Sequence, residues 1–189
     1  MKRLLAALLL TVLTTPVRAA AWDLAQLMDE LARTRGGKAR FVETKYLALL
    51  DRPIVASGEM RFTTPDRLEK RQLTPRPETL LLDKERLTIE RGQQKLSIDL
   101  TAQPEARAFV DSIRGALTGN RQALEKNYAL HLAGNRERWT LTLLPSDQAI
   151  AAIVHKISIA GQGNRIHSIE YLQADGDRAV ISIEHLPEK

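Results

Sequence analysis

The alternation of apolar and polar residues changes along the chain and predicts two kinds of element. In residues 22–35, Leu24, Leu27 and Leu31 recur at helical spacing, and Gly36 follows where this helix should end. From residue 38 onward the period becomes two, which is typical of strands with one apolar and one polar face. The clearest alternating segments are 86–90, 95–100, 128–132, 139–143 and 156–159, with shorter ones at 169–171 and 181–183.

The segments between these strands are short, and this limits how the strands can pair. Turns such as 83–85, 91–93 and 161–164 contain Gly, Asn or Asp and leave no room for the long crossovers that parallel strands need. We therefore expect about eleven antiparallel strands between residues 38 and 184, interrupted after about six strands by helical residues 104–124. The sequence predicts a mainly β (α+β) fold in a single domain covering residues 22–189.

A sheet of this size curls, and its concave apolar face needs a cover. Two short amphipathic helices cannot fill that face as a second sheet would, so we expect an apolar cavity under a helical lid, suited to an acyl chain. The alternative is a fully packed core, and strand parity is ambiguous at 38–50 and 78–83. The predicted lining consists of Met60, Phe62, Leu80, Leu82, Leu87, Ile89, Leu96, Ile98, Trp139, Leu141 and Leu143. The predicted lid consists of Leu27, Leu31, Phe109, Val110, Ile113 and Leu117.

The first 21 residues have the pattern of a secretory signal peptide. Lys2 and Arg3 precede an apolar run that is too short to span a bilayer, and small residues follow it. We expect cleavage after Ala21, with Ala19 as the alternative site, and a periplasmic mature protein. The sequence contains no cysteine, which suits an oxidising compartment and excludes disulfides and thiolate metal sites.

The charge of the chain does not favour nucleic acid as a partner. The formal net charge of +5 comes from 28 basic and 23 acidic residues, but three of the basic residues lie in the leader, so the rest has 25 basic residues and a net charge of +2. The densest charged segment lies between Pro65 and Pro77. It is either an edge strand protected from aggregation or a rim that contacts head groups or a partner protein. The predicted rim residues are Thr64, Arg67, Arg71 and Arg76.

The sequence contains no motif that points to catalysis. The four histidines lack metal-binding spacing, and there is no Gly-x-Ser-x-Gly turn. Glu43 lies on an otherwise apolar strand, where a desolvated general acid is one interpretation, but an ordinary exposed position on a mixed strand is favoured. We expect no enzymatic activity, no bound metal and no cofactor.

Several segments resemble the LolA-like family, the periplasmic carriers of outer-membrane lipoproteins. Residues 58–68, Gly-Glu-Met-Arg-Phe-Thr-Thr-Pro-Asp-Arg-Leu, resemble its strand, proline and strand. Residues 41–43 are similar to its Phe-x-Gln, and residues 79–89 to its hairpin around an Asp-Gly turn. The resemblance implies an unclosed half-barrel with a helical lid that binds acyl chains without catalysis. It also implies an inner-membrane ABC transporter as donor and an outer-membrane receptor as acceptor.

The chain departs from this family at three positions. Thr64 stands where the family has an Arg that helps hold the lid closed and is needed to pass cargo on, Lys84 replaces the Gly of the turn, and Glu43 replaces the Gln. These departures favour a LolA-related paralogue that carries another acylated or polyene lipid. We expect a monomeric carrier that passes acyl chains toward the outer membrane. The alternatives are a lipid-sensing adaptor that regulates a membrane-protein partner and, third, an exported enzyme acting on lipid or glycan.

Overall fold

The computed structural model describes residues 22–187, so the predicted leader lies outside the described residues. One antiparallel sheet contains eleven strands in the order β6-β5-β4-β3-β2-β1-β11-β10-β9-β8-β7. The strands are β1 (Gly36–Tyr46), β2 (Ile54–Thr63), β3 (Arg67–Thr74), β4 (Glu78–Asp83), β5 (Arg86–Arg91), β6 (Gln94–Asp99), β7 (Tyr128–Asn135), β8 (Arg138–Pro145), β9 (Val154–Gln162), β10 (Arg165–Gln173) and β11 (Arg178–His185). The helices are α1 (Leu24–Ala32), the 3-10 turn η1 (Leu100–Ala102), α2 (Pro104–Thr118), α3 (Arg121–Glu125) and α4 (Gln148–Ala151). The predicted mainly β fold, with six strands, a helical interruption and five strands, is confirmed.

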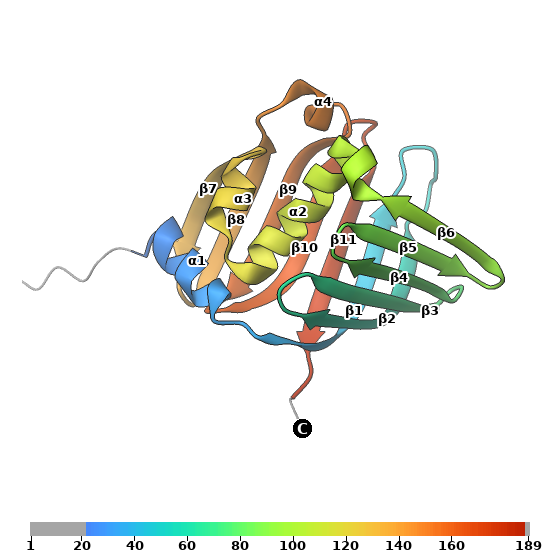
Figure 1. Cartoon of the computed structure of the whole chain (residues 1–189), viewed down its shortest axis with the longest axis horizontal. Helices are drawn as coiled ribbons and strands as arrows, with labels where there is room; N and C mark the ends of the chain where they lie inside the picture. The colour runs from blue at the N-terminus through green and yellow to red at the C-terminus, as the bar shows by residue number, and fades with distance from the viewer. Residues whose placement is uncertain (1–21, 188–189) are drawn as a thin grey trace, which may run out of the picture.

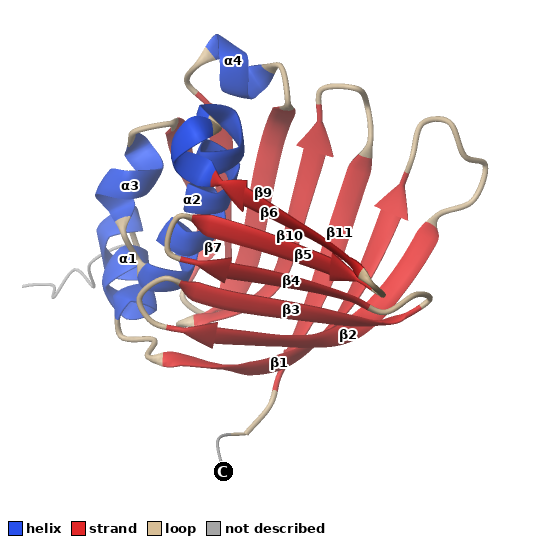
Figure 2. Ribbon diagram, turned by 45° about the vertical axis from the view of Figure 1, so that its right-hand side comes forward, coloured by secondary structure: helices blue, strands red, loops and turns tan. Residues whose placement is uncertain are grey.

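The sheet consists of two meanders that meet along one pair of strands. β1 to β6 form the first meander and β7 to β11 the second, and β1 pairs with β11 from Ala39 opposite His185 to Tyr46 opposite Arg178. The end strands β6 and β7 do not pair with each other, so the sheet is not closed into a barrel. It curls instead, and the two meanders enclose a concave face (Figures 1 and 2).

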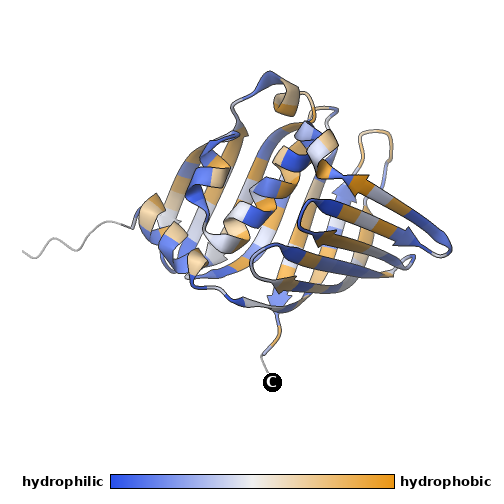
Figure 3. Cartoon of the chain, viewed as in Figure 1, coloured by the Kyte–Doolittle hydropathy of each residue, from blue (hydrophilic) through white to orange (hydrophobic). Residues whose placement is uncertain are grey.

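The helices cover the concave face unevenly. α1, α2 and α3 lie over the strands of the second meander, and most of the first meander extends beyond them (Figure 1). Beneath these helices Trp139, Leu141 and Leu143 of β8 pack with Ile157 and Ile159 of β9, and all five side chains are fully buried. Apolar bands alternate with polar ones along the strands of both meanders, as Figure 3 shows. The packed core is therefore concentrated in one half of the sheet.

Local signals explain where the helices begin and end. The Asp23 side chain accepts a hydrogen bond from the backbone N–H of Gln26, and this capping box starts α1 two residues later than the predicted range of 22–35. α2 begins at Pro104, which suits a first helical turn, and ends at Thr118, where the next residue, Gly119, caps it with a φ of +63° that favours glycine. The sequence pattern missed α4, since four residues are too few to show a helical period. No helix within residues 22–187 is long and apolar enough to cross a membrane.

Candidate functional site

Two rows of side chains cross β2 to β6 on the concave face. Residues directly opposite each other in an antiparallel pair project from the same side of the sheet, so the register defines each row. The first row consists of Phe62, Leu68, Leu82, Leu87 and Ile98. The second row consists of Met60, Lys70, Leu80, Ile89 and Leu96. These two rows, called the open rows below, are apolar at every position except Lys70.

The predicted lining residues share this concave face but differ in burial. Trp139, Leu141 and Leu143 belong to the packed core under the helices. Phe62 and Leu82 are also buried. The other predicted lining residues on β2, β4 and β5, together with Ile98, are only half-buried, and Leu96 is 56% exposed. The concave face is thus filled by side chains over the second meander and left open over the first.

The predicted lid residues also separate into two groups. Leu27 and Leu31 of α1 are part of the packed core, whereas Phe109, Ile113 and Leu117 of α2 are partly buried against it. Val110 is half-buried as well. The most buried residues of α2 are small ones that the predicted stripe did not include: Ala108, Ser112, Gly115 and Ala116. α2 therefore packs through its small residues, and its larger apolar residues lie at the margin of the core.

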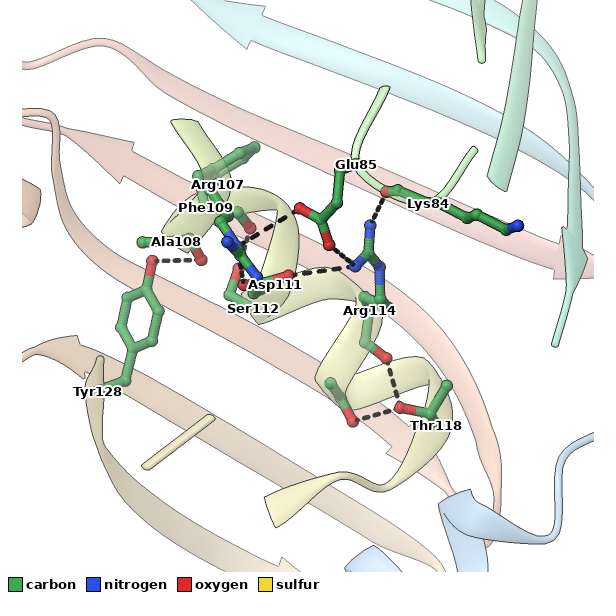
Figure 4. A network of polar contacts seen from close by, with 11 residues as sticks. Lys84, Glu85, Arg107, Ala108, Phe109, Asp111, Ser112, Arg114, Thr118 and Tyr128 are labelled. Atoms are coloured by element: carbon green, nitrogen blue, oxygen red, sulfur yellow. Dashed lines mark hydrogen bonds and ion pairs between the residues drawn. The ribbon is translucent and has the colours of Figure 1, made fainter. Parts of the chain in front are cut away.

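A network of charged residues ties α2 to the turn between β4 and β5 (Figure 4). The Glu85 carboxylate lies 3.5 Å from Nε of Arg107 and 3.6 Å from Nη1 of Arg114. Asp111 lies within 3.5 Å of both guanidinium groups, and Arg114 also donates a hydrogen bond to the Lys84 carbonyl. We call Glu85, Arg107, Asp111 and Arg114 the α2 latch. It connects the helix to the open half of the sheet.

The latch does not involve Thr64, the residue that replaces the family's lid arginine. Thr64 donates its hydroxyl to the Arg35 carbonyl at 3.1 Å and makes no contact of this kind with α2. The helix itself supplies the guanidinium groups, and the β4–β5 turn supplies the carboxylate. Sequence reasoning missed this link because no local pattern connects residues of α2 to Glu85 in the separate β4–β5 turn.

A buried polar cluster lies on the concave face, at the edge of the core that faces the first meander. The Glu43 carboxylate of β1 is 2.6 Å from Nζ of Lys70 on β3 and 3.7 Å from Nζ of Lys45. It also accepts a hydrogen bond from the Tyr171 hydroxyl of β10 at 3.1 Å. Glu43 is only 1% exposed, so the interpretation of it as an ordinary exposed residue is wrong. The sequence singled out Glu43 but not its partners, because Lys70 and Tyr171 come from distant strands.

The environment of Tyr171 connects this cluster to the lid. Burial raises the pKa of the Tyr171 phenol well above its usual range, and the neighbouring negative charge of Glu43 raises it further. The phenol therefore stays protonated and acts as a hydrogen-bond donor. Its ring also packs edge-to-face on Phe109 of α2, with ring centroids 5.5 Å apart. A movement of α2 would disturb this contact.

The predicted rim residues lie elsewhere. The register places Arg67 and Arg71 on the convex face, opposite in direction to Lys70, and Arg67 forms a 2.8 Å ion pair with Asp83. Arg76 lies in the β3–β4 turn, and its backbone carbonyl accepts a hydrogen bond from the Gln72 side chain of β3. The alternative of a protected edge strand is wrong, because β3 lies between β2 and β4 and the edges are β6 and β7. Contact of these arginines with a partner stays a prediction.

The surface depressions and histidines of the described residues do not coincide with the predicted lipid site. Two surface depressions, of about 270 and 540 Å³, are lined by polar turns around Arg136 and around Asn120, and neither includes a predicted lining residue. Within residues 22–187, no three histidine or acidic side chains are placed to hold a metal ion. His167 and His185 pack edge-to-face, whereas His131 and His155 lie on other strands. The β1–β2 loop exposes a separate apolar group, in which Leu49 is 97% and Leu50 50% exposed.

An unclosed antiparallel half-barrel with helices over part of its concave face defines the class of this protein. The family profile described as "Outer membrane lipoprotein carrier protein LolA-like" matches residues 16–182. The chain therefore belongs to the LolA-like family, and the resemblance inferred from residues 41–89 is confirmed. Comparison of the sequence with curated proteins gives no significant match.

The solved structures that match this chain are distant in sequence. The LolA superfamily protein NE2245 from Nitrosomonas europaea has a TM-score of 0.46 and 11% identity, over 88% of this chain and 93% of that one. A chain of the Pseudomonas aeruginosa MucA/MucB complex has a TM-score of 0.45 and 13% identity, over 88% of this chain and 59% of that one. A putative outer membrane lipoprotein-sorting protein domain from Vibrio parahaemolyticus has a TM-score of 0.44 and 9% identity, over 88% of this chain and 92% of that one.

Proposed function

We propose that this protein is a periplasmic carrier that binds acyl chains of lipoproteins or of another lipid on the open rows and passes them toward the outer membrane. The observation that carries the proposal is the uneven filling of the concave face. Three helices bury the second meander, yet the apolar residues of the open rows other than Phe62 and Leu82 remain half-buried or exposed. A contiguous apolar surface of this kind marks a site that another apolar molecule covers.

The energetics of burial are sufficient for binding without a covalent step. Each methylene group moved from water to an apolar surface contributes about 0.8 kcal/mol. About twelve methylene groups along the open rows would then contribute roughly 10 kcal/mol before the cost of ordering the chain. Aliphatic side chains such as Met60, Leu80 and Ile89 suit a flexible hydrocarbon chain. The proposal therefore assigns no catalytic role to any residue.

A carrier must also release its ligand, and this requires a second surface. Binding of this strength reverses only when the acyl chain finds an equally apolar acceptor or when the site changes shape. In the proposal, an inner-membrane exporter supplies the lipid and an outer-membrane acceptor removes it. The α2 latch joins α2 to the turn between β4 and β5, two strands that carry the open rows, so α2 is the element whose movement would accompany transfer.

Paired substitutions on β6 test the proposal. Leu96 is on the concave face and its neighbour Ser97 is on the convex face, and both side chains are exposed. Leu96→Glu and Ser97→Glu add the same charge at adjacent positions. We expect native mass spectrometry of periplasm-purified protein, with organic extraction, to detect an acyl ligand on the wild type and on Ser97→Glu. Leu96→Glu should lose it while its circular dichroism spectrum stays unchanged.

The β1–β2 loop requires a further control. Because Leu49 is almost fully exposed, an adventitious amphiphile could bind there, and Leu49→Ser removes that site without affecting the open rows. The ligand should remain on Leu49→Ser. The proposal is wrong if the wild type carries no acyl ligand and binds none on addition, or if Leu49→Ser removes the ligand and Leu96→Glu does not.

A further inference from the structure

The open rows contain one charged residue, and its position is unusual. Lys70 lies directly opposite Met60 on one side and Leu80 on the other, within the row that continues through Ile89 and Leu96. A charge placed among aliphatic side chains is unfavourable unless it is paired. Lys70 is paired with Glu43, at 2.6 Å, and its side chain remains 19% exposed.

The Glu43 carboxylate has partners for both oxygens, whereas Lys70 retains donor capacity. Oε1 of Glu43 accepts from the Tyr171 hydroxyl, and Oε2 accepts from Lys70. The Lys70 ammonium carries three N–H donors. One is directed to Glu43, and the Phe41 ring lies 4.8 Å from Nζ in a cation–π arrangement. At least one donor is therefore free for an acceptor that enters from the open rows.

The charge of the cluster selects the kind of acceptor. Lys45 and Lys70 both lie within 4 Å of the single Glu43 carboxylate, so the three side chains carry a net charge of +1. A ligand group with one negative charge would neutralise the cluster. A neutral ester would leave the excess positive charge, and a doubly charged phosphate would leave an excess negative charge in an apolar setting. The cluster thus matches a group with a single negative charge, such as the terminal carboxylate of an acyl chain.

We propose that Lys70 binds the carboxylate of an acyl ligand of the fatty-acid class, with the hydrocarbon chain lying along Leu80, Ile89 and Leu96. This inference rests on the proposed function and specifies the head group of its ligand. The three strand spacings from β3 to β6 give the chain about 14 Å of apolar surface. The Tyr171–Phe109 contact places the same cluster beside α2, so head-group binding and the position of the helix are coupled through Tyr171.

A matched pair of fluorescent probes tests the inference. 11-(Dansylamino)undecanoic acid and its methyl ester share chain and fluorophore and differ in charge. We expect the wild type to bind the acid about tenfold more tightly than the ester, the smallest difference expected from a charge-assisted hydrogen bond. Lys70→Gln, which still can donate to Glu43, should remove this preference.

A second variant predicts the opposite effect on the same ratio. Glu43→Gln raises the charge of the cluster to +2 and frees another Lys70 donor, so the preference for the acid should increase. Opposite changes cannot come from a general loss of folding. Lys95→Gln, on β6 in an exposed pair with Glu90, is the control and should leave the ratio unchanged.

Equal affinity of the wild type for acid and ester, unchanged in Lys70→Gln, would overturn the head-group inference while acyl binding stands. Failure of both probes to bind would instead contradict the proposed function, and the inference with it.

Discussion

The carboxylate of Glu85, in the turn after β4, lies 3.6 Å from the guanidinium of Arg114 on α2. The Arg114 side chain is only 18% exposed, so this ion pair is less screened by solvent than a typical surface pair. It connects the open half of the sheet to a helix whose main packing is against the other half. α2 is therefore tied to the open half of the sheet by a polar contact that can break and re-form.

Removal of the latch carboxylate should speed ligand exchange. Glu85→Gln keeps the size of the side chain and loses its ion pairs with Arg107 and Arg114, which contribute about 1 kcal/mol together. We expect the bound dansyl fatty acid to dissociate about fivefold faster in stopped-flow dilution, with the free energy of unfolding reduced by about 1 kcal/mol. Glu90→Gln, which removes an exposed pair with Lys95, should not change the dissociation rate. An equal effect of both variants would contradict a gating role.

Lys84 occupies a backbone conformation that favours glycine or asparagine. Its φ is +53°, and the left-handed region costs a side-chain-bearing residue about 1–2 kcal/mol. We expect Lys84→Asn to raise the free energy of unfolding by about 0.5 kcal/mol, because Asn tolerates this region and the Arg114 contact uses only the backbone carbonyl. Alanine does not tolerate the left-handed region as asparagine does, so Lys84→Ala should give no gain in the free energy of unfolding measured by urea denaturation. A gain in both variants would assign the effect to the lysine charge.

Gly119 joins α1 to α2 through a close approach as well as a positive φ. A Cβ at this position would clash with the Met28 carbonyl oxygen and the Ala32 amide nitrogen, whereas Gly92 has a similar φ with open space around it. Gly92→Ala should therefore cost about 1 kcal/mol from the backbone alone, and Gly119→Ala at least about 2 kcal/mol. Urea unfolding of the two variants separates the cost of the backbone conformation from the cost of the clash. Equal losses would show that α1 shifts away freely.

Tyr128 predicts a pH dependence of stability at alkaline pH. Burial raises the pKa of its phenol from about 10 to about 12. Below pH 10 the phenol is protonated in both the folded and the unfolded state, and its contribution to the free energy of unfolding is complete. Above pH 10 the phenol of the unfolded state ionises first, so this contribution is lost toward pH 12. The stability of the wild type relative to Tyr128→Phe should fall by about 2 kcal/mol between pH 9 and pH 12. A constant difference between the two proteins across this range would contradict the assignment.

The period-two pattern predicted the sheet well because strand parity depends only on neighbouring residues. It placed Met60 of β2 and Leu96 of β6 on the same face, although three strands lie between β2 and β6 in the sheet. The short turns then required antiparallel neighbours, so the two meanders followed from local sequence. The family resemblance supplied the remaining expectation, that the sheet stays unclosed.

The division of the concave face could not be predicted in the same way. Leu141 and Leu96 have the same alternating pattern, yet one is fully buried and the other is 56% exposed, because burial depends on where α1 to α3 dock. The Glu43 cluster was missed for a related reason. Its members lie on β1, β3 and β10, and only the curled sheet brings them together.

Five consecutive strands, from residue 54 to residue 99, carry the open rows, while the packed core is contributed mainly by residues before and after them. If the open rows bind the cargo as proposed, cargo preference and thermodynamic robustness are encoded in separate parts of one gene product. Descendants of such a chain can exchange aliphatic residues on the exposed strands to suit a new lipid without weakening the scaffold that holds them.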